Sequence, residues 1–409
     1  MSTHFNTYSQ AIDWLFSQLP NYQKDGGSAY KPGLGNIISL LDSLDNPHHK
    51  FKSIHLAGTN GKGSVSHIMA SAYQAGGYKV GIFTSPHIFD FRERVKINGQ
   101  FISEEEVIQF LNKTHAIIDE IKASFFEITA ALAFHVFANE SVDIAIIETG
   151  LGGRLDSTNV LKPELSVITN IGLDHQAFLG DTIELIAAEK AGIIKSKTPV
   201  LVGKKQEKTE EVFKEIAQKN KSSLHYAEQA DISTDLLGQF QNENASTALT
   251  AIKLLQETFP IDISVLHLGF NQVAETTNFK GRFQKISDQP LTIVDAAHNP
   301  DGVRNLMKEI EHLSFEKLHI VYGSSNDKEV SDVFLQMPKS AAYYLTTFDS
   351  KRSLTIIELN ALATSNSLSA DYYSGSELAL KAAQKKAANE DLILVFGSFY
   401  IMADILADD

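Results

Sequence analysis

Residues 52–75 read KSIHLAGTNGKGSVSHIMASAYQA, and this stretch decides the fold. Residues 52–57 are an apolar run typical of a short strand, residues 58–64 are rich in glycine, and residues 65–75 have the spacing of a helix. A loop between a strand and a helix turns several backbone N–H groups toward one point at the positive end of the helix, where a phosphate group binds. The stretch therefore predicts a phosphate-binding loop in an α/β domain.

The loop differs from the usual phosphate-loop pattern G-x-x-x-x-G-K-[ST] by one residue. Residues 58–64 read GTNGKGS, with an extra glycine between Lys62 and Ser64. Lys62 supplies a mobile positive charge, and Ser64 supplies a hydroxyl. The alternative is an ordinary glycine-rich turn without a ligand, but the flanking strand and helix favour the phosphate loop.

Composition limits the chemistry that the protein can perform. The chain has 409 residues, 43% of them hydrophobic and 21% charged, which is typical of a globular protein long enough for two domains. It has no cysteine, so it has no disulfide, thiolate zinc site or cysteine nucleophile. A metal would be bound by oxygen and imidazole ligands, which favours a hard cation such as Mg²⁺.

Charge and hydropathy exclude other classes of protein. The formal net charge of −14 opposes general binding to nucleic acid. No apolar run approaches the roughly 18 residues that a membrane-spanning helix needs, and residues 1–10 lack the features of a signal peptide. We therefore expect a cytoplasmic protein with no nucleic-acid partner and no membrane association.

Strands and helices alternate along the whole chain. We expect an α/β fold with a mostly parallel sheet in an N-terminal phosphate-loop domain, residues 1–283, and a smaller Rossmann-like α/β domain, residues 284–409. The junction is placed near residues 280–290, where Gly281 and Pro290 break the pattern and a linker is expected. The second domain has no phosphate loop, so we expect it to act as a lid or partner surface.

Polar side chains follow three predicted strands of the first domain. Ser85 follows strand 78–83, Glu148 follows the apolar run 142–147, and His175 lies beyond strand 165–169. Ligands bind beyond the carboxyl ends of strands in such sheets, so Ser85 should approach the phosphate loop if their strands are neighbours. A hydroxyl, a carboxylate and an imidazole near a triphosphate predict a divalent-cation site.

The helix after His175 carries an unexpected lysine. We expect Asp181 to be its N-cap, with Glu184 three residues later, and Ile186 to lie on its apolar face. Lys190 falls on that same face. One interpretation is that its ammonium reaches water along the apolar stem. The other is a buried amine with a lowered pKa that reacts with CO₂ to give a metal-binding carbamate.

A β-hairpin is predicted between the second strand and the next helix. Asn98-Gly99 is the signal for a type I′ turn. Arg92 and Arg94 precede it, and they are either a clamp for a carboxylate or a solvated charge cluster. Ser103 and Glu106 predict a capping box at the start of the helix that follows.

Five motifs together resemble those of a known family. They are GTNGKGS (58–64), TSPH (84–87), IETGLGGRLDSTN (147–159), NIGLDH (170–175) and EKAGII (189–194). They resemble the Mur ligase superfamily, and specifically its folylpolyglutamate synthase family, over nearly the whole chain. The resemblance implies an ATP-dependent ligase that adds L-glutamate to dihydropteroate and to the γ-carboxylate of folates through an acyl-phosphate intermediate.

The resemblance also implies the residues of the site. The nucleotide set combines the phosphate loop with positions later in the chain: Thr59, Asn60, Gly61, Lys62, Gly63, Ser64, Asn244, Arg282 and Asp295. The metal ligands would be Ser85, Glu148, His175 and a carbamylated Lys190. The pterin would contact Ser124, Phe125, Phe126, Leu155, Asp156 and Ser157. Lys62, Lys190 and His298 are the expected catalytic residues, and His298 belongs to the DAAHNP motif at 295–300.

The implied cofactors and partners are small molecules. They are ATP, Mg²⁺ at two sites, dihydropteroate, tetrahydrofolates and L-glutamate, and a requirement for K⁺ stays open. A monomer is expected.

Three other functions are open at this point. A peptidoglycan Mur ligase normally has a separate N-terminal domain before its phosphate loop, whereas here the loop begins at residue 58. A monofunctional folylpolyglutamate synthase lacks activity on dihydropteroate, and the sequence distinguishes it only through the matches in the pterin-contacting segments. A nucleotide-binding switch protein has no need of a buried lysine or of a second domain that faces the nucleotide.

Overall fold

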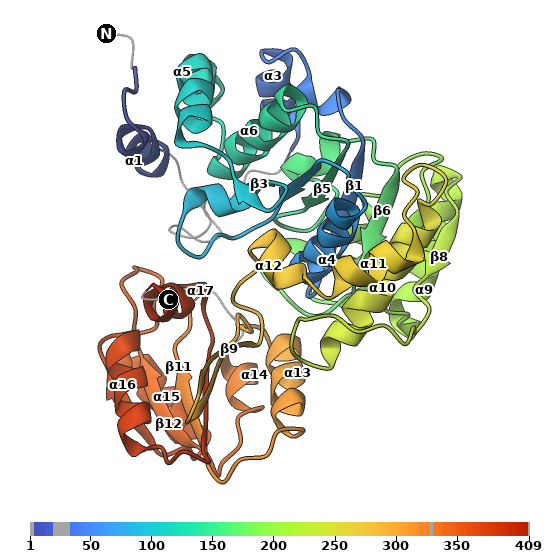
Figure 1. Ribbon diagram of the computed structural model, residues 1–409. Helices are drawn as coiled ribbons and strands as arrows, with labels where there is room; N and C mark the ends of the chain where they lie inside the picture. Colours follow the sequence, from blue (N-terminus) through green and yellow to red (C-terminus); the bar gives the residue numbers. More distant parts are fainter. Residues whose placement is uncertain (1–3, 19–32, 327–329, 408–409) are drawn as a thin grey trace. The chain divides into compact units, whose positions relative to one another are not determined.

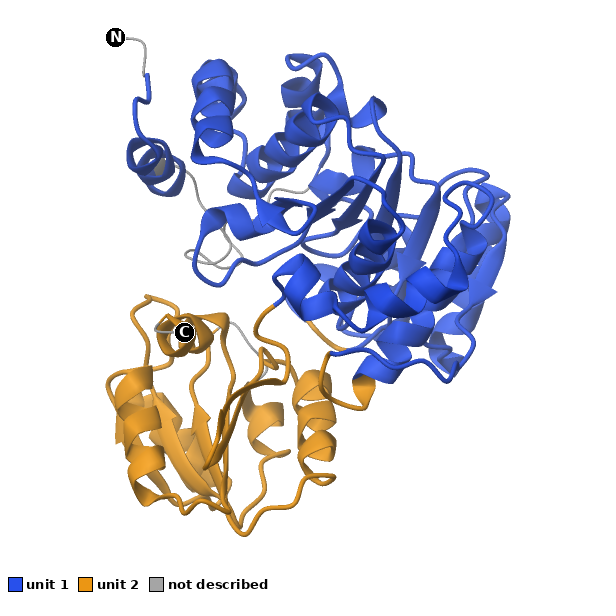
Figure 2. Cartoon of the chain, in the orientation of Figure 1, with its two compact units in different colours: residues 1–172, 176–235, 241–279 blue, residues 173–175, 236–240, 280–409 orange. Residues whose placement is uncertain are grey.

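The structure is a computed structural model that describes residues 4–18, 33–326 and 330–407. It consists of two compact units, coloured separately in Figure 2. Unit 1 comprises Met1–Gly172, Gln176–Asp235 and Gln241–Phe279, and unit 2 comprises Leu173–His175, Leu236–Phe240 and Lys280–Asp409.

Unit 1 is built on an eight-stranded sheet with the order β4-β3-β2-β5-β1-β6-β7-β8 (Figure 1). All neighbouring strands are parallel except for the β3–β4 hairpin, which adds antiparallel strands beside β2. The strands are β1 (Ser53–Ala57), β2 (Val80–Phe83), β3 (Val95–Ile97), β4 (Gln100–Phe101), β5 (Ile144–Glu148), β6 (Leu165–Ile168), β7 (Val200–Val202) and β8 (Leu224–Tyr226).

The central strands of this sheet are buried along their whole length. Every residue of β1, β5 and β6 is buried, as expected for parallel strands with helices on both faces. On one face, Phe83, Ala145 and Ile147 belong to a core with α1, α3, α5 and α6. The helices of unit 1 are α1 (Tyr8–Gln18), α3 (Gly35–Asp42), α4 (Lys62–Ala75), α5 (Glu104–Ile121), α6 (Phe125–Asn139), α7 (Gln176–Leu179), α8 (Ile183–Ala191), α9 (Glu207–Asn220), α10 (Phe240–Leu254), α11 (Ile263–Phe270) and α12 (Val273–Thr277).

The sheet order changes one expectation about the site. Strand β5 lies between β1 and β2, so the strands that lead to the phosphate loop and to Ser85 are not neighbours. Leu56 on β1 instead pairs in register with Glu148, the last residue of β5. The sheet therefore places Glu148 beside the loop more directly than Ser85.

Local signals at the hairpin and at α5 are confirmed. Asn98 has a φ of 48° and Gly99 a φ of 73°, as a type I′ turn requires. The Ser103 hydroxyl accepts the backbone N–H of Glu106, and the Glu106 carboxylate accepts the N–H of Ser103, which is the predicted capping box.

The predicted N-cap of α8 is wrong by one residue. Thr182, not Asp181, occupies this position, and its side chain accepts the backbone N–H of Leu185 at 3.2 Å. Thr182 has extended backbone angles that bring its hydroxyl over the first helical turn, and Glu184 falls within that turn.

Unit 2 contains a six-stranded sheet with the order β13-β12-β11-β14-β10-β9. Only β9 is antiparallel to its neighbour. The strands are β9 (Gln284–Asp288), β10 (Leu291–Val294), β11 (Leu318–Tyr322), β12 (Ala342–Thr346), β13 (Ala370–Tyr373) and β14 (Leu392–Phe396). The helices are α13 (Pro300–Ile310), α14 (Val330–Phe334), α15 (Ile356–Ser365), α16 (Ser376–Lys386) and α17 (Phe399–Leu406). This is the expected smaller α/β domain.

Strand β9 corrects the prediction of a linker at 280–290. Residues 284–288 form a strand at the edge of the sheet, paired with β10. None of the five residues is fully buried, so the stretch carries little of the apolar pattern that marks a strand.

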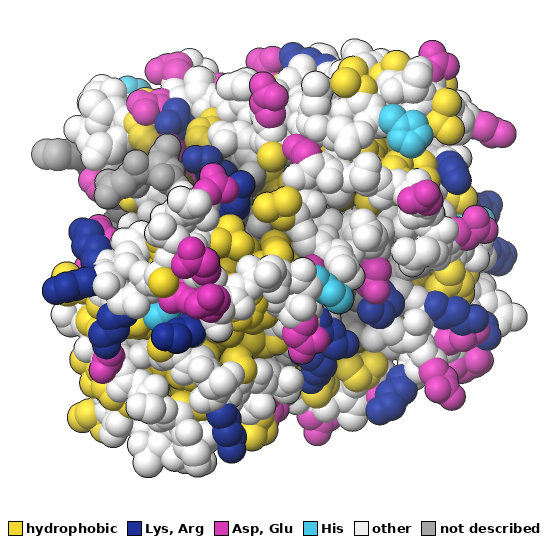
Figure 3. Space-filling view, turned by 60° about the horizontal axis from the view of Figure 1, so that its bottom comes forward, with side chains coloured by type: hydrophobic (Ala, Val, Ile, Leu, Met, Phe, Trp, Pro, Cys, Tyr) yellow, Lys and Arg dark blue, Asp and Glu magenta, His cyan; other side chains and the backbone are white. Residues whose placement is uncertain are grey.

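The charged side chains of the surface are mixed. On the face in Figure 3, lysine and arginine side chains are interspersed with aspartate and glutamate side chains and form no single basic surface. None of the helices within the described ranges has both the length and the apolar character needed to cross a bilayer.

Candidate active site

The turn between β1 and α4 requires glycine at two positions. Gly58 has a φ of +153°, and a Cβ atom there would lie 1.9 Å from the Thr169 hydroxyl oxygen. Gly61 has a φ of +83°, and a Cβ atom there would lie 2.5 Å from the Asn244 Oδ1. The backbone can approach these two side chains only without side chains of its own. The two glycines are therefore needed for the packing of the loop itself, in addition to leaving its backbone open to a phosphate group.

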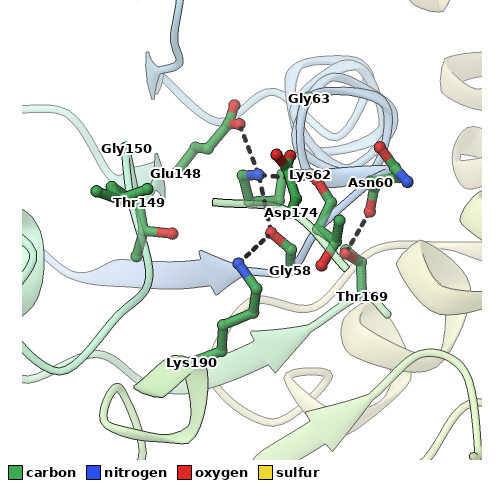
Figure 4. Close-up of polar contacts among 12 residues, drawn as sticks. Gly58, Asn60, Lys62, Gly63, Glu148, Thr149, Gly150, Thr169, Asp174 and Lys190 are labelled. Atoms are coloured by element: carbon green, nitrogen blue, oxygen red, sulfur yellow. Dashed lines mark hydrogen bonds and ion pairs between the residues drawn. The ribbon is translucent and has the colours of Figure 1, made fainter. Parts of the chain in front are cut away.

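The segment after β6 holds the phosphate loop in place. The Asn60 N–H donates to the Asn170 Oδ1 at 2.9 Å. The Thr169 hydroxyl donates to the Asn60 carbonyl at 2.6 Å (Figure 4). The Thr59 hydroxyl donates to the Gly172 carbonyl and accepts the Gly172 N–H, over 3.1 and 2.9 Å. We had not predicted this role for these residues. The sequence carries no local signal for these contacts, because they depend on the pairing of β6 with β1, which only the structure shows.

The remaining loop residues lie in the first turn of α4. Gly63 and Ser64 follow Lys62 there, where backbone N–H groups have no partner within the helix. His67 donates from Nδ1 to the Gly63 carbonyl at 2.8 Å. The Phe279 ring stacks on His67 with centroids 4.3 Å apart, so the end of unit 1 packs on the phosphate-loop helix.

Two lysines converge on the carbonyl of Gly58 (Figure 4). The Lys62 Nζ donates to this oxygen at 2.9 Å and to the Thr59 carbonyl at 3.3 Å, and it lies 3.7 Å from the Glu148 Oε1. The Lys190 Nζ donates to the same Gly58 oxygen at 2.9 Å. Lys190 is only 5% exposed, so the interpretation in which its ammonium reaches water is wrong.

The predicted metal ligands come from both units. Glu148 is a buried carboxylate at the end of β5, and Ser85 is half-buried beyond β2. His175 is grouped with unit 2, where its backbone N–H donates to Asp174. Mg²⁺ is usually bound by one or two carboxylates together with phosphate oxygens and water, so Glu148 and Ser85 fit this donor set. Within the described ranges, three or more His, Asp or Glu residues do not cluster as a metal site.

Asn244, which we predict to bind the nucleotide, lies beside the phosphate loop. It occupies the first turns of α10, and its Oδ1 faces Gly61. Its Nδ2 donates to the Gln241 Oε1 at 2.8 Å. Gln241 is fully buried and was not predicted as a site residue.

The three predicted site residues beyond residue 280 lie together in unit 2. The buried Asp295 carboxylate accepts the N–H groups of Phe283 and Ala297, each at 2.7 Å. Burial raises the pKa of Asp295, and the nearby Arg282 opposes this. His298 donates from Nδ1 to a backbone carbonyl, which leaves Nε2 as the acceptor of the neutral ring. Arg282 and His298 both lie against the ring of Phe399, at 5.0 and 6.0 Å.

The first predicted pterin segment begins α6. Ser124 and Glu127 form a capping box: the Ser124 N–H donates to the Glu127 carboxylate at 2.6 Å, and the Ser124 hydroxyl accepts the Glu127 N–H. Phe125 is buried, and the ring of Phe126 packs on Gly150, where a Cβ atom would lie 2.5 Å from it. The first predicted pterin segment therefore packs against the loop after β5 that leads to the second.

Asp156 organises the second pterin segment. Its Oδ2 accepts the N–H groups of Gly150 and Leu151 at 2.8 and 2.9 Å, and its Oδ1 accepts the N–H and hydroxyl of Thr158. The His55 Nε2 donates to the same Thr158 hydroxyl oxygen at 2.7 Å. Burial raises the pKa of Asp156. Its two predicted neighbours in this segment are half-buried: Leu155 and Ser157.

Neither arginine before the hairpin is a solvated charge. Arg92 forms an ion pair with Asp90 at 2.7 Å. Arg94 is buried, donates to the His87 Nδ1 at 2.7 Å and lies 5.1 Å from the centre of the Phe125 ring. Burial lowers the pKa of Arg94 to about 10 and holds the pKa of His87 well below its usual value. Arg94 therefore joins the end of β2 to the predicted pterin segment.

The sequence of this chain matches two domain families of the Mur ligases and a relative of known name. Residues 56–266 match the Mur ligase middle domain, and residues 281–399 match the Mur ligase glutamate ligase domain. The dihydrofolate synthase/folylpolyglutamate synthase of Bacillus subtilis is 33% identical over 98% of this chain and 99% of its own. The chain belongs to the folylpolyglutamate synthase family of Mur ligases. The resemblance seen in its motifs is thereby confirmed.

Solved members of this Mur ligase family share its fold. FolC of E. coli, solved in complex with DHPP and ADP, superposes with a TM-score of 0.87 at 26% identity, over 98% of this chain and 97% of that one. A bifunctional folylpolyglutamate synthase/dihydrofolate synthase, solved with Mn, AMPPNP and L-glutamate, gives a TM-score of 0.86 at 26% identity over 100% and 99%. The α/β fold with two mostly parallel sheets is therefore confirmed for this ligase.

Proposed function

We propose that this Mur ligase is a bifunctional dihydrofolate synthase and folylpolyglutamate synthase. It joins the amino group of L-glutamate to the carboxylate of dihydropteroate and to the γ-carboxylate of folates, at the expense of ATP. The observation that carries this proposal is the convergence of Lys62, Glu148 and Lys190 on a glycine-rich phosphate loop, in a chain related over 98% of its length to an enzyme of that name.

The reaction has two chemical steps. A carboxylate oxygen of the pterin substrate attacks the γ-phosphorus of ATP, and the bond from this phosphorus to the β-phosphate oxygen breaks. ADP departs, and the substrate carboxylate becomes an acyl phosphate. The neutral amine of glutamate then attacks the acyl carbon, phosphate leaves with the C–O bonding pair, and the amine loses a proton. The site must bring the reactants into line and keep water from the acyl phosphate.

The nucleotide binds at the phosphate loop in this proposal. The N–H groups of the first turn of α4 and the Lys62 ammonium bind its phosphates, and Lys62 exchanges its contacts to Gly58 and Thr59 for them. Asn244, whose side chain lies next to Gly61, supplies a further contact to the nucleotide. Arg282 and Asp295 supply contacts from unit 2, and His298 helps to position the transferred group.

A divalent cation, which we take to be Mg²⁺, binds at two sites next to the nucleotide. Ser85, Glu148, His175 and a carbamylated Lys190 are its proposed ligands. When bound, it neutralises charge on the phosphates during transfer. Glu148 fits this role because it is a buried carboxylate within ion-pair distance of Lys62. Whether K⁺ also binds is decided by activity measured with and without it.

The pterin binds against the two loops that meet at Gly150. The proposed contacts come from Ser124, Phe125 and Phe126 on α6 and from Leu155, Asp156 and Ser157 in the loop after β5. Aromatic rings suit the flat pterin, whose ring they can stack on. Asp156 shapes this loop through its four accepted hydrogen bonds.

The experiment is a phosphate-release assay with ATP, Mg²⁺ and L-glutamate. Parallel reactions contain 7,8-dihydropteroate, tetrahydrofolate, or neither. Release that depends on glutamate in both of the first two reactions supports bifunctionality. A response to tetrahydrofolate alone supports a monofunctional folylpolyglutamate synthase.

The same assay distinguishes this ligase from a peptidoglycan-type ligase and from a nucleotide switch. A peptidoglycan-type ligase would respond to neither pterin, and a nucleotide switch would bind ATP without releasing phosphate in a glutamate-dependent way. We further propose that the enzyme is a cytoplasmic monomer without a nucleic-acid or membrane partner. A molar mass of one chain by light scattering, in the presence of nucleotide, would agree with this.

A further inference from the structure

Gln241 lies one helical turn before Asn244, at the start of α10. Its side chain has no exposed surface, and its Oε1 accepts a hydrogen bond from the Asn244 Nδ2 at 2.8 Å. Because the Nδ2 end of the Asn244 amide is held by Gln241, the Oδ1 end points to the phosphate loop at Gly61. The pair thus fixes which end of the amide the loop meets.

The other end of the Gln241 amide is a buried donor. Its Nε2 is buried and has no hydrogen-bond partner among the residues that the structure describes. Burying an unpaired amide donor is unfavourable, and an apolar side chain of similar size would avoid this cost. Packing alone therefore does not require a glutamine here, whereas its Oε1 makes a bond to a residue at the phosphate loop.

Gly61 makes the position of Asn244 sensitive to this bond. The glycine has left-handed backbone angles and closes the turn just before Lys62, and the Asn244 oxygen occupies the space that a side chain at 61 would fill. An amide free to rotate would exchange its oxygen for an NH₂ group at the same place. The loop would then meet a donor in place of an acceptor.

We propose that Gln241 is a positioning residue of the nucleotide site. It holds the Asn244 amide in the orientation that the phosphate loop requires and so sets the affinity for ATP. The proposal rests on the nucleotide role of Asn244 in the proposed function, and it adds a residue that acts through Asn244 without touching the nucleotide itself.

The test measures ADP binding to the full chain by isothermal titration calorimetry, with KM values for each substrate alongside. Gln241→Met keeps the size of the side chain but removes the acceptor. It should weaken ADP binding and raise the KM for ATP about tenfold, and leave the KM for glutamate unchanged. Gln241→Glu keeps an oxygen for the Asn244 Nδ2 and should bind ADP nearly as the wild type does, even if its thermal midpoint falls.

A double mutant separates positioning from an independent effect. In the Asn244→Ala background, Gln241→Met should cause no further loss of ADP affinity, because nothing remains for Gln241 to orient. Ser246→Ala is the matched control: Ser246 is buried on the same helix, but its hydroxyl accepts the N–H of Ala230. It should lower the thermal midpoint without changing ADP affinity.

Three results would overturn the inference. They are wild-type ADP affinity in Gln241→Met, losses that multiply in the double mutant, and equal losses in Gln241→Met and Gln241→Glu. If the wild type binds no adenine nucleotide, the proposed function falls together with this inference. If the wild type binds ADP and only the variants disagree, the proposed function stands and Gln241 is a packing residue.

Discussion

Lys62 and Lys190 share one hydrogen-bond acceptor: both Nζ atoms donate to the carbonyl oxygen of Gly58, each over 2.9 Å. Two ammonium groups so close repel each other, and the Glu148 carboxylate, 3.7 Å from Lys62, offsets only part of that repulsion. Conversion of Lys190 to a carbamate would replace the repulsion with an attraction to Lys62. The shared carbonyl thus gives a structural reason for the proposed modification.

Removal of the Lys190 amine should abolish this modification. We expect Lys190→Ala and Lys190→Arg to lose ligase activity by at least about a hundredfold, because neither side chain can form a carbamate and both leave the second metal site incomplete. ¹³C NMR of the wild type in ¹³C-bicarbonate should show a carbamate signal that both variants lack. Lys195→Ala, which removes a half-buried lysine bonded to the Asn159 carbonyl, is the control and should keep the signal. An unlabelled wild type with full activity would disprove the carbamate.

Lys62 should contribute mainly to the transition state. Lys62→Met keeps the aliphatic stem but removes the charge, and we expect kcat to fall about 10²–10³-fold, as for loss of one preorganised donor. Steady-state phosphate release measures this. Lys79→Met, which removes an ion pair with Glu140 at the surface, should leave kcat unchanged. Equal activity of the two variants would contradict the phosphate role of Lys62.

Asp156 should matter for stability and for the pterin together. Asp156→Asn replaces one carboxylate oxygen with an NH₂ group that faces backbone N–H donors, and we expect the free energy of unfolding to fall by about 1–3 kcal/mol. The KM for dihydropteroate should rise, since the loop loses its shape, while the KM for ATP should not. Chemical denaturation and initial rates measure the two effects. Asp288→Asn, at an exposed position, serves as the control and should change neither.

His55 should make unit 1 less stable in acid. Its Nε2–H donates to Thr158, its Nδ1 is buried without a partner in the described part of the chain, and burial lowers its pKa to about 3. In the unfolded chain it takes up a proton near pH 6.5. The folded state therefore binds fewer protons below that pH, and the free energy of unfolding falls by about 1.4 kcal/mol per pH unit until the pH approaches 3.

The variant His55→Gln isolates this contribution. Glutamine can still donate to Thr158 but does not titrate, so the variant should lose about 2 kcal/mol less than the wild type between pH 6.5 and pH 5. The fluorescence of Trp14, the one tryptophan of the chain, reports unfolding of unit 1 in urea at each pH. Identical pH dependence of the two proteins would show that His55 is not kept neutral by burial.

Sequence patterns predicted most of the fold because its elements carry strong signals. The central strands are continuous apolar runs, and the phosphate loop and the Asn98-Gly99 turn have specific residues at specific positions. Strand β9 was missed because an edge strand of unit 2 buries little of its surface, so residues 284–288 show no apolar alternation. Neighbouring Thr182 and Asp181 are both good caps, and only the backbone angles decide between them.

The candidate site was only partly accessible from the sequence. Polar residues at strand ends predicted Glu148. The position of Lys190 on the apolar face of its helix left open whether its ammonium reaches water, and the structure shows that it is buried. The order of the strands was not predicted, because it depends on crossovers that local patterns do not record, and so β5 was not expected between β1 and β2. Thr169 acts through a contact with Asn60, which is more than 100 positions away, and Gln241 acts through the side chain of Asn244. Neither residue belongs to a recognisable sequence motif.

Gly58 and Gly61 pack closely against Thr169 and Asn244. Their presence in a related sequence is therefore weak evidence that the related protein still uses ATP. A lineage that stopped using ATP would still be held to glycine at both positions, because any larger residue would collide with its own neighbours. Survival of the glycines would then report only that the chain still folds. Lys62 is under no such steric restriction, so its loss or retention is the better genetic marker of a working ligase.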